Sequence, residues 1–165
     1  MDKIILSLLV DNTSGVLSRI AGLFSRRAYN IDSLTVGVTA NPNISRMTIV
    51  SRGDELVLHQ ILAQLRKQED VRDVKVLQPG SSVDRELILV KVMADVRNRR
   101  DITDIANIFR ANIVDVQKDS LIIELTGSQS KLSALLDMLS DYQIAELART
   151  GITGLTRGAE DVRYY

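Results

Sequence analysis

One order of strands and helices occurs twice along this chain of 165 residues. In the first copy, an apolar strand at 4–10 is followed by an amphipathic helix at 15–28. Two alternating strands then flank an Asn-Pro-Asn loop, which is typical of a hairpin formed by 31–39 and 45–51. A helix marked by leucine and isoleucine and a strand at 71–77 complete the order βαββαβ.

The second copy begins after Pro79, Gly80, Ser81 and Ser82, which are typical of a linker. Apolar spacing predicts a strand at 86–94, then a helix, two short strands, another helix and a closing strand at 143–149. We therefore predict an α+β chain with two tandem ferredoxin-like domains, 1–78 and 86–165, joined by a linker at 79–85. The tail after Thr150 contains three glycines in TGITGLTRG and is expected to be irregular.

The first strand of each copy is apolar on both of its faces. The first reads IILSLLV and the second ELILVKVMA, without the alternation of a strand that has one face in water. Each is therefore predicted to lie inside a sheet whose two faces are both covered.

Composition excludes several classes of partner. Twenty-one basic residues balance 21 acidic residues, so the chain has no net field that would attract a nucleic acid or an acidic membrane. There is no cysteine, which excludes disulfides and thiol catalysis. No apolar stretch reaches membrane-spanning length, and we expect a cytoplasmic protein.

Catalytic residue types are scarce. His59 is the only histidine, and its place beside the apolar stripe of the second helix indicates a helix-flank residue. Without cysteine or a second histidine, a transition-metal site is not indicated, and no phosphate-binding glycine motif occurs. A small enzyme is therefore the weakest hypothesis.

RNA-binding modules share the order βαββαβ, but they stack bases on aromatic residues of the central strands. The central strands predicted here contain no aromatic residue.

The segment DNTSGVL joins the first strand to the first helix and predicts a pocket for a small anion. The first N–H groups of a helix, here near Gly15, Val16 and Leu17, have no partners within the helix and favour a carboxylate or phosphate. Glycine presents no side chain that would obstruct the approach. The alternative is that Asn12, Thr13 and Ser14 form a turn and cap the helix.

Five blocks of the sequence resemble the regulatory small subunits of acetolactate synthase, also called acetohydroxyacid synthase. They are LVDNTSGVLSRIAGLFSRRAYNIDSLTV, SRMTIVSRGDE, RELILVKV, IFRANIVDV and ELARTGITGLTRG. The resemblance implies an N-terminal ACT domain, which senses amino acids, and a C-terminal domain that engages the catalytic large subunit. It also implies a chain without catalytic residues, metal or cofactor of its own, acting on a thiamine-diphosphate enzyme of branched-chain amino-acid biosynthesis. That enzyme condenses two pyruvates, or pyruvate with 2-oxobutyrate, under feedback inhibition, usually by valine.

The resemblance further implies that the effector lies between the ACT domains of a homodimer. The edge strand at 31–39 is able to pair with its copy across a two-fold axis. One departure is Ala28, where the family often has glycine at a helix end. A free-standing ACT-domain sensor acting on another partner is the alternative function. The implied effector-binding residues are Asn12, Gly15, Val16 and Leu17 of one chain with Asn30 and Ile31 of the other.

Overall fold

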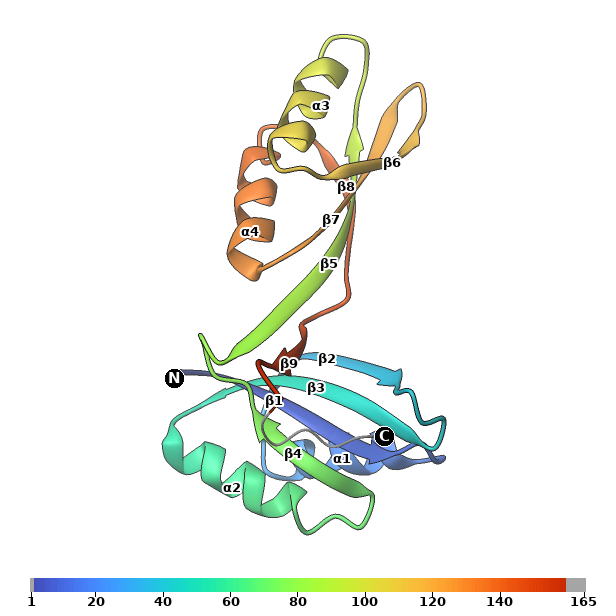
Figure 1. Ribbon diagram of the computed structural model, residues 1–165. Helices are drawn as coiled ribbons and strands as arrows, with labels where there is room; N and C mark the ends of the chain where they lie inside the picture. Colours follow the sequence, from blue (N-terminus) through green and yellow to red (C-terminus); the bar gives the residue numbers. More distant parts are fainter. Residues whose placement is uncertain (1, 160–165) are drawn as a thin grey trace. The chain divides into compact units, whose positions relative to one another are not determined.

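The computed structural model describes residues 2–159 and divides the chain into two compact units. Of the described residues, the first unit contains 2–84 and 152–159, and the second contains Arg85–Gly151. Each unit combines one antiparallel sheet with two helices, so the predicted α+β class with two ferredoxin-like repeats is confirmed (Figure 1).

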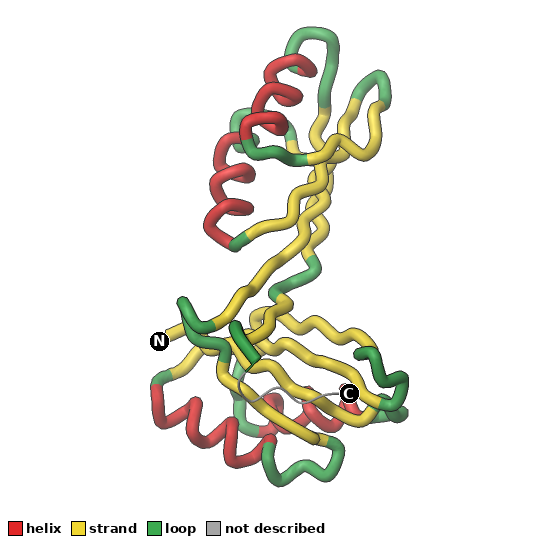
Figure 2. The backbone as a smooth tube through the Cα atoms, viewed as in Figure 1, coloured by secondary structure: helices red, strands yellow, loops and turns green. Residues whose placement is uncertain are grey.

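The first unit has the strand order β2-β3-β1-β4, with both helices on one face of the sheet (Figures 1 and 2). The even-numbered residues of β1, from Ile4 to Val10, pack against helix residues such as Phe24 and Ile61 in one apolar core. Its elements are β1 (Asp2–Asp11), α1 (Val16–Arg26), β2 (Ile31–Val38), β3 (Ile44–Gly53), α2 (Glu55–Leu65) and β4 (Val71–Val76).

The opposite face of this sheet is partly covered by the C-terminal tail. Its strand β9 (Thr153–Thr156) pairs with β5 (Ser82–Met93). Just before it, the main-chain oxygen of Ile152 accepts a hydrogen bond of 2.9 Å from the Thr35 hydroxyl, and the Ile152 side chain is buried. Ser7 and Leu9, which face this side of β1, are buried as well.

Glycine is required inside the tail because the chain approaches its neighbours closely. A Cβ atom on Gly154 would lie 2.8 Å from Cδ1 of Leu77 and 3.0 Å from the main-chain oxygen of Val83. A larger residue there would displace β9 from the beginning of β5. Gly154 is therefore a packing requirement of the first unit.

Two boundaries differ from the sequence prediction. The expected linker at 79–85 is shorter, because Ser82, Val83 and Asp84 already belong to β5. The tail was expected to be irregular and to belong to the C-terminal domain, but it contains β9 and clusters with the first unit. Residues 160–165 of the expected tail lie outside the described residues.

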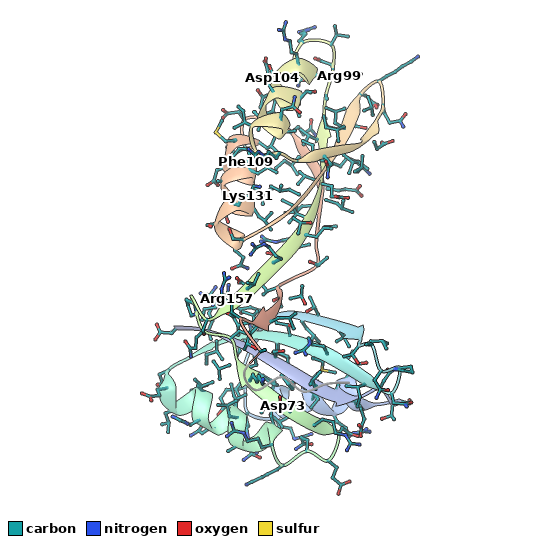
Figure 3. The ribbon with its side chains drawn as sticks, viewed as in Figure 1. Asp73, Arg99, Asp104, Phe109, Lys131 and Arg157 are labelled. Carbon is teal, nitrogen blue, oxygen red and sulfur yellow. The ribbon has the colours of Figure 1, made fainter. Side chains whose placement is uncertain are left out.

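The second unit repeats the arrangement with the order β6-β7-β5-β8. Helices α3 and α4 lie on one face (Figure 1), and their apolar residues join Ile88, Val90 and Val92 of β5 in a second core. The further elements are α3 (Arg99–Ile108), β6 (Asn112–Val116), β7 (Ser120–Gly127), α4 (Gln129–Met138) and β8 (Ile144–Arg149). Arg99, labelled in Figure 3, donates a hydrogen bond of 2.7 Å to the main-chain oxygen of Gln117 and so ties α3 to the β6–β7 turn.

The internal repeat extends to the ends of two helices. Ala28 after α1 and Arg110 after α3 both have φ near 55°, in the left-handed region. In both places the following N–H group donates to a carbonyl five residues earlier, from Tyr29 to Phe24 and from Ala111 to Ala106. Ala28 therefore keeps the left-handed turn that glycine usually makes, at a cost of about 1 kcal/mol or more.

A buried ion pair closes the second unit where the chain enters and leaves it. Glu86 accepts two hydrogen bonds of 2.9 Å from the guanidinium of Arg149. The Glu86 side chain is 3% exposed, whereas Arg149 is 39% exposed. The hydrogen bonds from Arg149 hold the pKa of Glu86 below its ordinary value.

We expect Glu86→Gln to destabilise the second unit in a pH-dependent manner. Because Arg149 remains partly hydrated, the loss at neutral pH should be about 1–3 kcal/mol, less than for a fully buried pair. The lowered pKa stabilises the folded chain above the ordinary pKa of glutamate, and this contribution disappears as the pH falls through the folded value. Urea unfolding should therefore show a difference between the wild type and the variant that narrows on acidification.

Glu146→Gln is the matched control, because Glu146 pairs with Lys91 on the same sheet but is exposed. It should change stability little at any pH. A Glu86→Gln effect that is the same at neutral and acidic pH would show that the ion pair is not its cause.

Candidate functional site

The start of α1 has no side-chain cap among the described residues. Gly15 occupies the N-cap position with φ 85° and ψ −7°, a left-handed conformation. The Val16 N–H group makes only a long contact of 3.5 Å to the Thr13 oxygen, and the first regular helical bond runs from Arg19 N–H to the Gly15 oxygen at 3.0 Å. The alternative is therefore correct in part: the segment forms a turn, but no side chain of Asn12, Thr13 or Ser14 caps the helix. The N–H groups that follow Gly15 stay available to a ligand.

A guanidinium group lies beside these N–H groups. The Nε atom of Arg19 donates to Oδ2 of Asp70 at 2.7 Å, and this bond raises the pKa of Arg19. A Cβ atom on Gly15 would lie 2.9 Å from Nη1 of Arg19. The helix start thus combines backbone donors with a cation whose position Asp70 restrains, which suits an anionic ligand. Arg19 was not among the site residues predicted from the sequence, although its position four residues after Gly15 places it over that glycine.

Asn12 is tied to the loop between β2 and β3. Its main-chain N–H donates to the Asn43 oxygen, and its side-chain Nδ2 donates to the Pro42 oxygen, both at 2.8 Å. These two bonds hold the Asn12 side chain near the helix start. Asn12, Gly15, Val16 and Leu17 therefore lie near one another around the end of β1.

Asn30 lies at the beginning of β2. Its Nδ2 atom donates to Asp32 at 2.7 Å, and its main-chain oxygen accepts a hydrogen bond of 2.6 Å from the Ser51 hydroxyl. Asp32 is in turn bound by Arg52. Ile31, the next residue, is partly buried and packs against the core of the first unit. The two predicted residues of this segment are therefore held in place by β3.

Within one chain, these two groups of residues lie at opposite ends of the sheet. Asp11 pairs with Ile44 and Ile31 pairs with Ser51, so the two ends are seven positions apart along β3. At about 3.4 Å per residue, this separates them by about 24 Å. Asn12 and Asn30 of the same chain therefore cannot contact one amino acid together.

An apolar patch lies at the end of the sheet that carries Asn12. Leu17, Val36 and Val38 are about half exposed, at 46%, 48% and 60%. Val36 and Val38 belong to β2, which forms one edge of the sheet. Val38 and Val10 pair with the same residue, Ser45, from its two sides, which places the patch beside the end of β1. Exposed apolar side chains on an edge strand are typical of an interface.

Other kinds of site find no support in the described part of the chain. Residues 2–159 contain no cluster of three or more histidine, cysteine, aspartate or glutamate side chains that would hold a metal. His59 is exposed and lies 3.6 Å from Glu55 on the same helix, as expected of a helix-flank residue. None of the described helices is long and apolar enough to cross a membrane.

Comparison with known families matches both units. Residues 6–73 match the family model of the ACT domain of acetohydroxyacid synthase small subunits, and residues 85–158 match the small subunit of acetolactate synthase. The second match continues through β9, although the structure groups that strand with the first unit.

Relatives of similar length are also named acetolactate synthase small subunits. The probable acetolactate synthase small subunit of Methanothermobacter thermautotrophicus is 49% identical over 159 residues, covering 96% of this chain and 95% of the relative. The isozyme 3 small subunit of Escherichia coli is 47% identical and is covered to 98%. The crystal structure of the acetolactate synthase small subunit from Thermotoga maritima superposes with a TM-score of 0.90 at 38% identity, covering 96% of this chain and 99% of that one. The chain belongs to the family of acetolactate synthase small subunits, the non-catalytic partners of that enzyme.

Proposed function

We propose that this chain activates the thiamine-diphosphate catalytic subunit of acetolactate synthase and makes it sensitive to feedback inhibition by valine. The observation that supports feedback most directly is the uncapped start of α1, where Gly15 exposes backbone donors beside Arg19. The carboxylate of an amino acid would accept hydrogen bonds from these donors. The side-chain amides of Asn12 and Asn30 offer neutral hydrogen-bonding groups for the carboxylate or the ammonium.

The effector site is shared between two copies of the chain. Strands β1 and β2 run in the same direction, because both are antiparallel to β3. If β2 pairs with its copy in antiparallel fashion, the partner's first β2 residues lie next to the end of β2, near Val38. This pairing brings Asn30 and Ile31 of one chain toward Asn12 and Gly15 of the other. It also covers the patch of Leu17, Val36 and Val38.

The side chain of the effector would meet an apolar surface at this place. Leu17 and Val38 are exposed there, and such a surface favours a branched aliphatic side chain over a polar one. Valine, leucine and isoleucine differ by one methylene group or by branching, which changes binding by about 1–3 kcal/mol in an apolar pocket. We propose valine as the effector on the family resemblance.

A free-standing ACT-domain sensor is the second candidate function. Its only specific support is that the first unit has the complete ferredoxin-like core and does not need the second unit to form it. The match of residues 85–158 to the small-subunit model favours the regulatory subunit, since a sensor alone has no need of that unit.

Reconstitution tests the proposal. The purified chain alone should produce no acetolactate from pyruvate, because its relatives are non-catalytic subunits. Mixed with its cognate catalytic subunit, it should raise the rate of acetolactate formation above that of the catalytic subunit alone. Acetolactate formation by this chain alone, or no change on mixing, would contradict the proposal.

The shared site requires a homodimer. Sedimentation velocity of the purified chain should show a dimer at tens of micromolar, and Val38→Asp should weaken it, because a carboxylate would replace an exposed apolar side chain on the edge strand. Valine binding should weaken in parallel with dimer formation. A monomer that binds valine with undiminished affinity would refute the shared site.

Gly15→Asp should abolish valine sensitivity while activation persists. The new carboxylate would occupy the N–H groups meant for the ligand and repel the ligand carboxylate. The crowding at Arg19 Nη1 involves the flexible end of a side chain, so the helix can still form. Wild type should couple valine to the catalytic subunit by roughly 5- to 150-fold, and the variant should show no coupling. Valine titration of the reconstituted enzyme measures the difference.

Gly80→Asp is the matched control, because Gly80 has φ +86° and no atom within 4 Å of its added Cβ. It carries the same backbone strain and the same new charge away from the helix start. It should keep an ordinary valine inhibition curve. An unchanged curve for Gly15→Asp would place the effector elsewhere, and equal effects of both variants would show that backbone strain is the cause.

A further inference from the structure

A second polar site lies on the sheet face of the first unit that is opposite α1 and α2. Arg46 of β3 donates a hydrogen bond of 2.7 Å from Nη1 to the hydroxyl of Ser7 on β1. Ser7 is only 3% exposed. A polar pair of this kind is unexpected at the centre of a sheet face that the tail partly covers. The family resemblance implied no role for either residue.

A cavity of about 190 Å³ lies beside this pair and is formed by residues of β1, β3, β4 and the tail. Its polar lining includes Ser7, Arg46 and Lys75, together with Asp73 of β4, which is labelled in Figure 3. Leu9, Leu77 and Leu155 supply apolar wall. A second hollow, of about 520 Å³, is lined by Arg46, Leu155 and residues of β2. Arg46 and Leu155 therefore line both hollows.

Arg46 lacks a hydrogen-bonded carboxylate among the described residues. Its guanidinium bonds only Ser7, and Asp73 acts on it through space. Burial lowers the pKa of Arg46, because the charged group has lost water. A guanidinium has five N–H donors, and those not used by Ser7 suit the two oxygens of a carboxylate. A bound anion would replace the hydration that burial removes.

A buried hydroxyl on the same face is also without a partner. Thr48 pairs with Ser7 across β1 and β3, is 1% exposed, and its Oγ1 atom has no hydrogen-bond partner in the part of the chain that the structure describes. Buried hydroxyls are usually satisfied by protein or ordered water. The sheet face next to Ser7 therefore has a hydroxyl whose hydrogen-bonding capacity is unused, although Thr48 itself does not line the cavity.

We propose that Arg46 and Ser7 bind the carboxylate of a short-chain aliphatic monocarboxylate in the cavity beside the tail. The class follows from one available guanidinium, the leucine walls and a volume too small for a nucleotide. Short 2-oxo acids and simple fatty acids share this chemistry. The site is separate from the start of α1, so the inference does not depend on the proposed valine site.

Isothermal titration of the purified full chain tests the proposal with pyruvate, butyrate, inorganic phosphate and valine as separate probes. Pyruvate, butyrate or both should bind saturably at one site per chain. The probe with the higher affinity shows whether the site prefers a 2-oxo acid or a simple fatty acid. Arg46→Gln should weaken that binding by roughly 10- to 100-fold, as expected for lost hydrogen bonds to a charged group. Arg46→Lys should be intermediate, because it keeps the charge but loses the planar fork.

Arg52→Gln is the control, because Arg52 lies on the same face of β3 but pairs with Asp32. It should leave carboxylate binding unchanged, as should Gly15→Asp. If Arg46→Gln lowers the unfolding temperature, Ser7→Ala and Arg46→Lys are compared with the wild type in its place. No saturable carboxylate binding, unchanged affinity in Arg46→Gln, competition by valine, or binding of phosphate in place of carboxylates would each overturn the proposal.

Discussion

The effector site proposed for the first unit depends on the directions of strands β1 and β2. Since β1 and β2 both pair antiparallel with β3, they run in the same direction, and the end of β1 lies about 24 Å from the start of β2. The two groups of proposed effector residues therefore sit at opposite ends of one sheet. Because β2 is an edge strand with exposed Val36 and Val38, an antiparallel copy of β2 is the simplest way to reunite them. In the proposed function, effector binding and dimerisation would therefore be thermodynamically linked.

The placement of both helices on one face of the first sheet explains why the C-terminal tail returns to the other face. Helices α1 and α2 leave the other face of the first sheet open, and the chain returns through Ile152 and β9 to cover part of it. The hydrogen-bonded pair of half-buried Arg46 and buried Ser7 lies on that face. Residues that follow the second unit in sequence thus stabilise the first unit. A truncation after Gly151 would expose Leu9, Leu77 and the buried hydroxyls of this face.

The sequence predicted the elements well because their signals are local. Helical and alternating periodicity located both βαββαβ repeats, and IILSLLV correctly indicated a strand covered on both faces. The same prediction was wrong for the second copy, because burial alternates along β5 and Leu89 is 38% exposed. The return of β9 depends on long-range pairing and close glycine contacts, for which a short TGLT segment gives no periodic signal. The helix-start glycine was predicted, but the Arg19–Asp70 pair joins residues 51 positions apart and was not.

The absence of cysteine allows the shared site to be tested by cross-linking. Asn12→Cys and Asn30→Cys variants are prepared separately, mixed, allowed to exchange subunits and treated with a short bismaleimide. Covalent dimers should form in the mixture, and a chain that carries both cysteines should form no internal cross-link when Val38→Asp and dilution keep it monomeric. Dimers by sedimentation without any 12-to-30 cross-link would contradict a site formed by two chains.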